Sequence, residues 1–194
     1  MLYTEKNVLT ALKNGKIHLK KGDILTPAAR DLIAQLDVAK PENMTHLNAK
    51  ELVEKTHPRI AFRGKIDSLE AEILLCQKEA GAPVAALQEM LDFVRKLIRA
   101  DVLGETVGPF QLCGMDEAQL RERSHNPQKY YGIGHVPPTC ADSMVHLRLN
   151  HLRTSVRETE LQSYHAFPDR TDIHTALNRL SSLCWILCLQ EKTK

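Results

Sequence analysis

The sequence predicts an all-α protein, an antiparallel bundle of four to five long helices with a small N-terminal extension. Four long segments carry apolar residues at alternating steps of three and four, the spacing that gathers side chains on one face of an α-helix. Glycine and proline interrupt the chain between these segments. Most connections are therefore short, and consecutive helices are expected to run antiparallel.

Residues 1–48 are expected to form the extension, and residues 49–194 the bundle domain. Lys16–Leu19 is typical of a short strand. A threonine followed by a proline is typical of a helix N-cap, which predicts a helix over Thr26–Gln35. Residues 37–48 are expected to be a linker. The extension is too short for a core of its own, so we expect it to pack against the larger domain or a partner.

The first long helix is expected to begin at Pro58, and the second to run from Val84 to about Gly104 after a Gly-Ala-Pro break. Their apolar stripes are Phe62, Ile66, Leu69, Ile73 and Cys76, and then Val84, Leu87, Leu91, Val94 and Ile98.

A short helix is predicted over Asp116–His125, where an Asn-Pro pair stops it. The next long helix is predicted over about 141–165, and Pro168 separates it from the last one. The stripes of these two long helices are Val145, Leu149, Leu152 and Val156, and then Ile173, Leu177, Leu180, Cys184 and Leu187.

The connection Tyr130–Cys140 mixes aromatic, glycine and proline residues. This composition is equally typical of a long bundle connection and of a loop that covers a substrate. His135 is the only histidine in a glycine-rich loop, and such a lone histidine is more often a surface residue than a functional one.

The 194 residues, 43% hydrophobic and 26% charged, have the composition of an ordinary globular domain. A net charge of +2 lacks the basic footprint of a general nucleic-acid binder. No apolar run approaches the roughly 18–20 residues that cross a bilayer, and the first residues do not resemble a secretory signal. We expect no nucleic acid and no membrane as partners.

The five cysteines are widely spaced and include no CxxC pair, which argues against a disulfide framework and a zinc ribbon. Cys184 and Cys188 lie in an apolar helical pattern, where a free cysteine usually behaves as a small buried hydrophobe. This usage is typical of a reduced, cytoplasmic protein.

A polar stripe lies beside the apolar one on the next-to-last helix, formed by His146, Asn150, Arg153, Arg157 and Glu160. It can be a solvated face with an Arg157–Glu160 surface pair. It can also be an anion site, because two guanidiniums one turn apart can clamp adjacent phosphates.

Two other helices carry polar residues at the edge of their apolar stripes. Arg63 and Asp67 flank the stripe of the first long helix, where a carboxylate normally needs a cationic partner. The last helix has a polar side formed by His174, Asn178, Ser181 and Trp185. Taken singly, each of these residues is more often structural than catalytic.

Four strings, in this order, resemble the ethanolamine-utilisation corrinoid adenosyltransferases: HPRIAFRGKIDSLE (57–70), LIRAD (97–101), LRTSVRETE (152–160) and ALNRLSS (176–182). LTPAAR (25–30) and MTHL (44–47) are similar to the N-terminal part of the same family, so the resemblance covers nearly the whole chain. Gly64–Leu69 and Asn178–Ser181 are also similar to the PduO-type adenosyltransferases, which are helical bundles assembled as trimers.

The resemblance implies the cobalamin adenosyltransferase fold and ATP-dependent adenosylation of a corrinoid cobalt. In that chemistry cob(II)alamin loses its lower axial ligand and is reduced, and the cob(I)alamin attacks the 5′ carbon of ATP. The product is adenosylcobalamin for ethanolamine ammonia-lyase. The implied partners are ATP with Mg²⁺, the corrinoid and a flavin-type reductase. A homotrimer is implied, in the cytoplasm or inside a bacterial microcompartment.

The resemblance also assigns roles. Arg157 and Asn178 match positions that contact ATP. Arg153 matches an arginine that pairs with an aspartate, here Asp67, across a subunit interface. Glu160 matches an acid that helps to hold Mg²⁺ or orients Arg157. Asp67, Arg153 and Arg157 are thus the expected catalytic residues.

Arg63, Lys21, Val136 and Pro137 complete the expected cofactor-binding set. Val136 and Pro137 lie where, in the family, an apolar side chain displaces the lower axial ligand of the corrinoid.

Two departures from the PduO-type pattern concern the phosphates. Glu158 stands where that pattern has a second consecutive arginine. Its glycine-rich nucleotide segment is absent from the start of this chain, so Lys20, Lys21 and Thr26 are the N-terminal candidates for meeting the triphosphate.

A third departure concerns metal. Some members of the ethanolamine family carry a cysteine-rich insertion, H-x11-C-C-x2-C, before the Thr-His-Leu string and use it for a transition metal. This chain has no cysteine before Cys76, and a thiolate site needs several converging soft ligands. We expect no resident iron or zinc, and Mg²⁺ only as the companion of ATP.

Two other function classes stay open: a non-catalytic corrinoid- or nucleotide-binding protein, and a microcompartment docking protein that uses residues 1–40 for interaction. The joint presence of Asp67, Arg153, Arg157 and Asn178 favours the enzyme, because docking does not need them.

Overall fold

The computed structural model describes residues 1–11, 22–35, 42–48 and 51–194. The chain divides into two compact units, Met1–Lys55 and Thr56–Lys194. The predicted strand at 16–19, together with Lys20 and Lys21, lies outside the described residues. Within the described part, no helix combines the length and the apolar character needed to cross a membrane.

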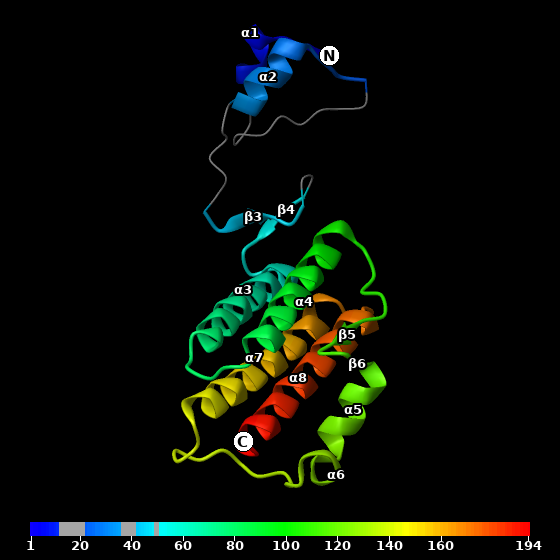
Figure 1. The fold of residues 1–194 in the computed structure, drawn as a ribbon. Coiled ribbons are helices and arrows are strands. Elements are labelled where there is room, and N and C mark those ends of the chain that lie inside the picture. The colour runs from blue at the N-terminus through cyan, green and yellow to red at the C-terminus, as the bar shows by residue number, and fades with distance from the viewer. Residues whose placement is uncertain (12–21, 36–41, 49–50) are drawn as a thin grey trace. The chain divides into compact units, whose positions relative to one another are not determined.

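The first unit combines short helices with two-stranded pairings (Figure 1). Its elements are β1 (Leu2–Tyr3), α1 (Glu5–Val8), a 3-10 turn (Leu9–Ala11), β2 (Ile24–Leu25), α2 (Pro27–Gln35), β3 (Met44–His46) and β4 (Leu52–Glu54). Strands β1 and β2 pair in parallel, and β3 and β4 form an antiparallel hairpin.

The predicted helix over Thr26–Gln35 is confirmed as α2, because the Thr26 hydroxyl accepts a hydrogen bond from the Ala29 amide at 3.2 Å. Two other expectations were wrong. The predicted linker contains β3, and the extension has a small core of its own, in which Tyr3, Val8 and Ala29 are buried together.

The second unit is the predicted helical bundle (Figure 1). Its elements are α3 (Pro58–Gln77), α4 (Val84–Leu103), β5 (Gln111–Leu112), β6 (Met115–Asp116), α5 (Glu117–His125), α6 (Pro127–Tyr131), α7 (Met144–Ala166) and α8 (Thr171–Lys192). Helix α7 packs against both α8 and α3, α3 packs against α4, and the short α5 lies along α8.

The predicted apolar stripes form the core. Every stripe residue of α3, α7 and α8 is buried, and so are the three middle residues of the α4 stripe. The two end residues of the α4 stripe are not buried. Val84 is exposed as the first residue of the helix, and Ile98 is half-buried.

Two local features were not predicted. Cys113 (φ 52°) and Gly114 (φ 70°) form a two-residue turn between β5 and β6, which pair in the register Leu112 to Met115. A turn with two positive φ angles is the kind that suits a tight hairpin. The Asn-Pro pair ends α5 as predicted, but the proline then begins α6.

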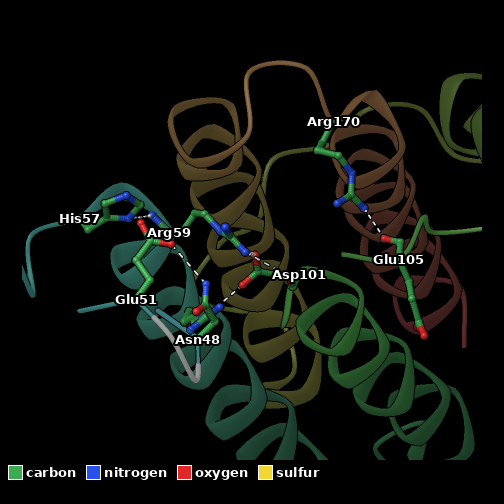
Figure 2. A network of polar contacts seen from close by, with 8 residues as sticks. Asn48, Glu51, His57, Arg59, Asp101, Glu105 and Arg170 are labelled. Atoms are coloured by element: carbon green, nitrogen blue, oxygen red, sulfur yellow. Dashed lines mark hydrogen bonds and ion pairs between the residues drawn. The ribbon is translucent and has the colours of Figure 1, made fainter. Parts of the chain in front are cut away.

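A buried ion cluster ties the start of α3 to the end of α4 (Figure 2). The Asp101 carboxylate has no exposed surface. Its Oδ1 accepts from Nε and Nη2 of Arg59 at 2.8 and 2.6 Å, and its Oδ2 accepts from Nε of Arg63 at 2.7 Å. The Arg59 guanidinium also lies over the Phe167 ring, 5.4 Å from its centroid. One carboxylate therefore fixes two helices next to the residue that ends α7.

Replacement of Asp101 by Ala is expected to lower the free energy of unfolding by about 3 kcal/mol, the lower end for breaking a buried pair. The loss is not larger because Arg59 and Arg63 keep side-chain exposures of 29% and 19%. Chemical denaturation measures it. The matched control is Asp92→Ala, on the exposed face of α4, with an expected change below about 0.5 kcal/mol. Equal losses in the two variants would contradict a structural role for the cluster.

Candidate functional site

The polar stripe of α7 divides in the structure. His146 is buried, and its Nδ1 lies 3.1 Å from the Cys188 carbonyl oxygen, so it belongs to the core. Asn150, Arg153 and Glu160 are half-buried, and Arg157 is exposed. Because a ligand can reach only side chains that are not fully buried, these four residues of the stripe remain candidates for the anion site.

A cavity of about 560 Å³, here called the central cavity, opens between α7 and α8. It is lined by Ser124, His125, His135, Arg153, Arg157, Glu160, Leu161, Asn178, Ser181, Ser182 and Trp185. Most of the predicted ATP-contacting residues thus meet around one space, which favours the anion-site interpretation over a plain solvated face.

A second cavity of about 510 Å³, here called the loop cavity, adjoins the first. Its lining combines Val136 and Pro137 of the loop with Arg153, Arg157 and Trp185, which also line the central cavity. The structure therefore brings the two predicted loop residues to the predicted arginines.

The loop is held over the last helix by aromatic stacking. The His135 ring lies parallel to the Trp185 ring, with centroids 5.5 Å apart and an interplanar angle of 6°. The Arg153 guanidinium lies 5.8 Å from the Trp185 centroid, and Asn150 Oδ1 accepts from Arg153 Nε at 3.3 Å and from Nη2 at 3.1 Å. Of the two interpretations of the loop, this contact favours a covering segment, and His135 belongs to the site.

A chain of hydrogen bonds fixes the amide of Asn178. Its Nδ2 donates to Glu160 Oε1 at 2.9 Å, and its Oδ1 accepts from Nη2 of Arg179. Glu160 on α7 and Asn178 on α8 are thus joined across the helix pair. Arg179 did not appear in the sequence prediction of the site.

Two predicted residues do not line these cavities, and a third is not among the described residues. Arg63 is bound to Asp101, and it does not line the central or the loop cavity. Asp67 is exposed on α3 with no ion pair in the described residues, so it does not meet Arg153 within the chain. Lys21 lies outside the described residues.

Glu158, the departure from the arginine pattern, points to α3. Its Oε2 accepts from Lys65 Nζ at 2.8 Å, and this hydrogen bond lowers the pKa of the Glu158 carboxyl. His174 is also structural, since its ring is buried and stacks on Tyr164 at 3.9 Å.

Comparisons with known proteins identify the family of this chain. The sequence profile of the family described as cobalamin adenosyltransferase matches residues 38–191. This chain belongs to the cobalamin adenosyltransferase family. The corrinoid adenosyltransferase EutT of Escherichia coli K12 is 34% identical over 183 residues, which cover 91% of this chain and 68% of that protein. EutT of Salmonella typhimurium LT2 is 33% identical over the same shares.

These likenesses confirm the resemblance predicted from the four strings. No solved structure gave a significant match.

The cysteines of this family member are not arranged for metal. Burial raises the pKa of the Cys76 thiol to about 11 and that of Cys188 to about 12, and Cys184 is fully buried. Such thiols stay protonated and serve as hydrophobic side chains, as predicted for the last two. In the described residues, no group of three or more His, Cys, Asp or Glu side chains could hold a metal ion. The absence of resident iron or zinc stays a prediction.

Replacement of His135 by Ala is expected to shift the fluorescence maximum of Trp185 to longer wavelength, because the indole loses its stacked ring and gains contact with water. Trp185 is the only tryptophan, so the emission spectrum reports on this adenosyltransferase cavity alone. His125→Ala is the control, since that residue lines the central cavity without stacking on the indole. An unchanged spectrum for His135→Ala would show that the loop does not cover the ring.

Proposed function

We propose that this chain is a corrinoid adenosyltransferase, which forms adenosylcobalamin from ATP and a reduced corrinoid for use by ethanolamine ammonia-lyase. The observation that carries the proposal is the junction of the central and loop cavities at Arg153, Arg157 and Trp185. A transfer between two substrates needs two adjoining binding spaces, one for each.

In the proposed transfer, an electron pair of cobalt(I) forms the bond to C5′ of ATP. The C5′–O bond breaks, and the polyphosphate leaves with that electron pair on its oxygen. The task of the protein is to align the two reactants and to stabilise the negative charge that grows on the leaving oxygen.

Arg157 is the cation best suited to that charge. It is exposed, it lines both cavities, and it has no ion-pair partner in the described part of the chain. Its guanidinium is thus available for a charge-assisted hydrogen bond to phosphate.

Asn178 and Glu160 would contact the same nucleotide. Their mutual hydrogen bond holds the amide and the carboxylate at the wall of the central cavity. Glu160 suits an Mg²⁺ ion brought by ATP, because Mg²⁺ at nucleotide sites takes one or two carboxylates together with phosphate oxygens.

Val136 and Pro137 would face the corrinoid. Their side chains offer neither a metal ligand nor a hydrogen-bond partner, so they can displace the lower axial ligand without replacing it. Loss of that ligand makes reduction of cobalt(II) easier, which fits a flavin-type reductase as the electron donor.

We also propose that Asp67 of one subunit pairs with Arg153 of another in a homotrimer. Asp67 is exposed and has no ion pair in the described residues, and no carboxylate lies within ion-pair distance of Arg153 there. A second copy would supply each with a partner. The expected location, in the cytoplasm or in a microcompartment, rests on the resemblance alone.

The experiment that tests the function mixes the protein with chemically reduced cobalamin and Mg-ATP, and follows the light-sensitive cobalt–carbon product by absorbance. Quenching of Trp185 fluorescence reports corrinoid binding separately. Binding of both substrates without product would favour a non-catalytic carrier, and binding of neither would favour a docking protein.

Replacement of Arg157 by Ala is expected to raise the KM for ATP roughly tenfold or more, since a charge-assisted phosphate bond contributes about 1.5–3 kcal/mol. Asn178→Ala should act in the same direction. The control is Arg148→Ala on the same helix, whose guanidinium pairs with Glu79 at 3.0 Å. A normal KM for ATP in both site variants would show that the polar stripe of α7 is an ordinary solvated face and not an ATP site.

Replacement of Asp67 by Asn is expected to lower the adenosylation rate at least tenfold with an unchanged thermal midpoint, if the pair forms between subunits. Asp92→Asn is the control, because this aspartate is also exposed and only accepts from Gln88 at 3.0 Å. Normal turnover of the Asp67 variant would contradict an inter-subunit site.

A further inference from the structure

A third cavity, of about 810 Å³ and here called the side cavity, lies among α5, α7 and α8. Its lining is Pro109, Phe110, Asp116, Glu117, Ala118, Arg121, Glu160, Tyr164, Thr171, His174, Thr175, Asn178 and Arg179. Glu160 and Asn178 also line the central cavity, so the two spaces meet at this hydrogen-bonded pair.

Two arginines line the side cavity, Arg121 from α5 and Arg179 from α8. Burial, and then the positive charge of Arg121, lower the pKa of Arg179. Arginine nonetheless remains charged. The cavity thus gathers two like charges that repel each other.

Neither guanidinium is neutralised by a contact. In the described residues no carboxylate lies within ion-pair distance of Arg121 or Arg179, although Glu117 and Glu160 attract Arg179 from farther away. Nε and Nη1 of Arg179 are buried without any hydrogen-bond partner in the described part of the chain. Buried donors of a charged group are costly to leave unsatisfied, whereas the buried Asp101 carboxylate of the same unit is paired with two arginines.

The acidic residues of the lining decide which anion fits. The Asp116 carboxylate is occupied as the N-cap of α5, where it accepts from the Gln119 amide at 2.8 Å. Glu117 and Glu160 remain beside the two arginines. A mixture of arginines and carboxylates suits a polyphosphate that carries Mg²⁺ better than a bare anion, because the carboxylates meet the metal and the arginines meet the phosphates.

We infer that the side cavity holds the outer phosphates of the nucleotide, with Arg121 and Arg179 as two cations that contact them in addition to the phosphate contact proposed for Arg157 in the central cavity. The nucleoside lies in the central cavity, and the phosphate chain passes Asn178 into the side cavity. This inference rests on the proposed function for the identity of the nucleotide. It deepens that proposal by assigning the outer phosphates to α5 and α8 rather than to the N-terminal lysines.

Calorimetric titration of the full-length protein with Mg-ATP, with AMP and with Mg-tripolyphosphate tests the inference without turnover. Arg121→Ala and Arg179→Ala are each expected to weaken Mg-ATP and tripolyphosphate roughly tenfold, while AMP changes less than about twofold. Arg179→Lys should recover only part of the loss, since an ammonium cannot reproduce the guanidinium fork. Arg123→Ala is the matched control on α5, because that side chain lies over Tyr130 and does not line the side cavity.

Arg121→Ala is the sharper variant, because Arg121 is exposed and its side chain makes no hydrogen bond or ion pair in the described residues. Tripolyphosphate binding as tight as wild type in both alanine variants would overturn the inference. Equal losses of AMP and ATP would overturn it too, because the arginines would then hold the whole site rather than the phosphates. If the wild-type protein binds tripolyphosphate through these arginines but forms no cobalt–carbon bond, the proposed function fails and the subsite stands.

Discussion

The packing of α7 against α8 is the constraint on which the site depends. Apolar residues at steps of three and four bury one face of each helix, as with Leu152 on α7 and Leu180 on α8. The residues one position beside that seam must then face each other at its edge. The Arg153 guanidinium lies over the Trp185 ring at this edge. The Asn178 amide donates a hydrogen bond to Glu160 there. The core pattern therefore positions the polar groups before any substrate contributes.

The second unit contains charged side chains that are paired in the fold and charged side chains that line cavities without a counterion in the described residues. Asp101 is buried and receives two arginines, so it closes a structural joint at one end of α3 and α4 (Figure 2). Arg157, Arg121 and Arg179 line cavities and receive no carboxylate in the described residues. Arg157 and Arg121 are exposed, whereas Arg179 is half-buried with two donors unsatisfied in the described residues. Because a desolvated cation without a counterion lowers stability, the place of Arg179 beside the side cavity is better explained by an anionic ligand than by the fold.

The sequence predicted what local periodicity determines and missed what long-range packing determines. The stripe from Phe62 to Cys76 could be predicted because burial follows helical spacing. Asp101 is the last residue of the LIRAD string, but its ion pairs with Arg59 and Arg63 depend on how α4 is aligned against α3. Arg179 follows Asn178 directly, yet its place in a cavity depends on α5 lying along α8. The His135–Trp185 stack likewise joins residues 50 positions apart, which no spacing rule connects.

The two departures from the PduO-type pattern that concern the phosphates both remove positive charge from the positions where that pattern has it. By the resemblance, Glu158 stands where the PduO-type pattern has a second consecutive arginine, and here it pairs with Lys65, which ties α7 to α3. Both side chains of this pair are largely exposed, at 62% and 46%, so the tie itself adds little stability. The position thus no longer supplies a cation to a triphosphate. In our inference the charge comes from another element, since α5 brings Arg121 to the cavity that Arg179 and Asn178 also line. In the inference drawn above, α5 and α8 supply the positive charge that the PduO-type resemblance would assign to α7 and a glycine-rich segment.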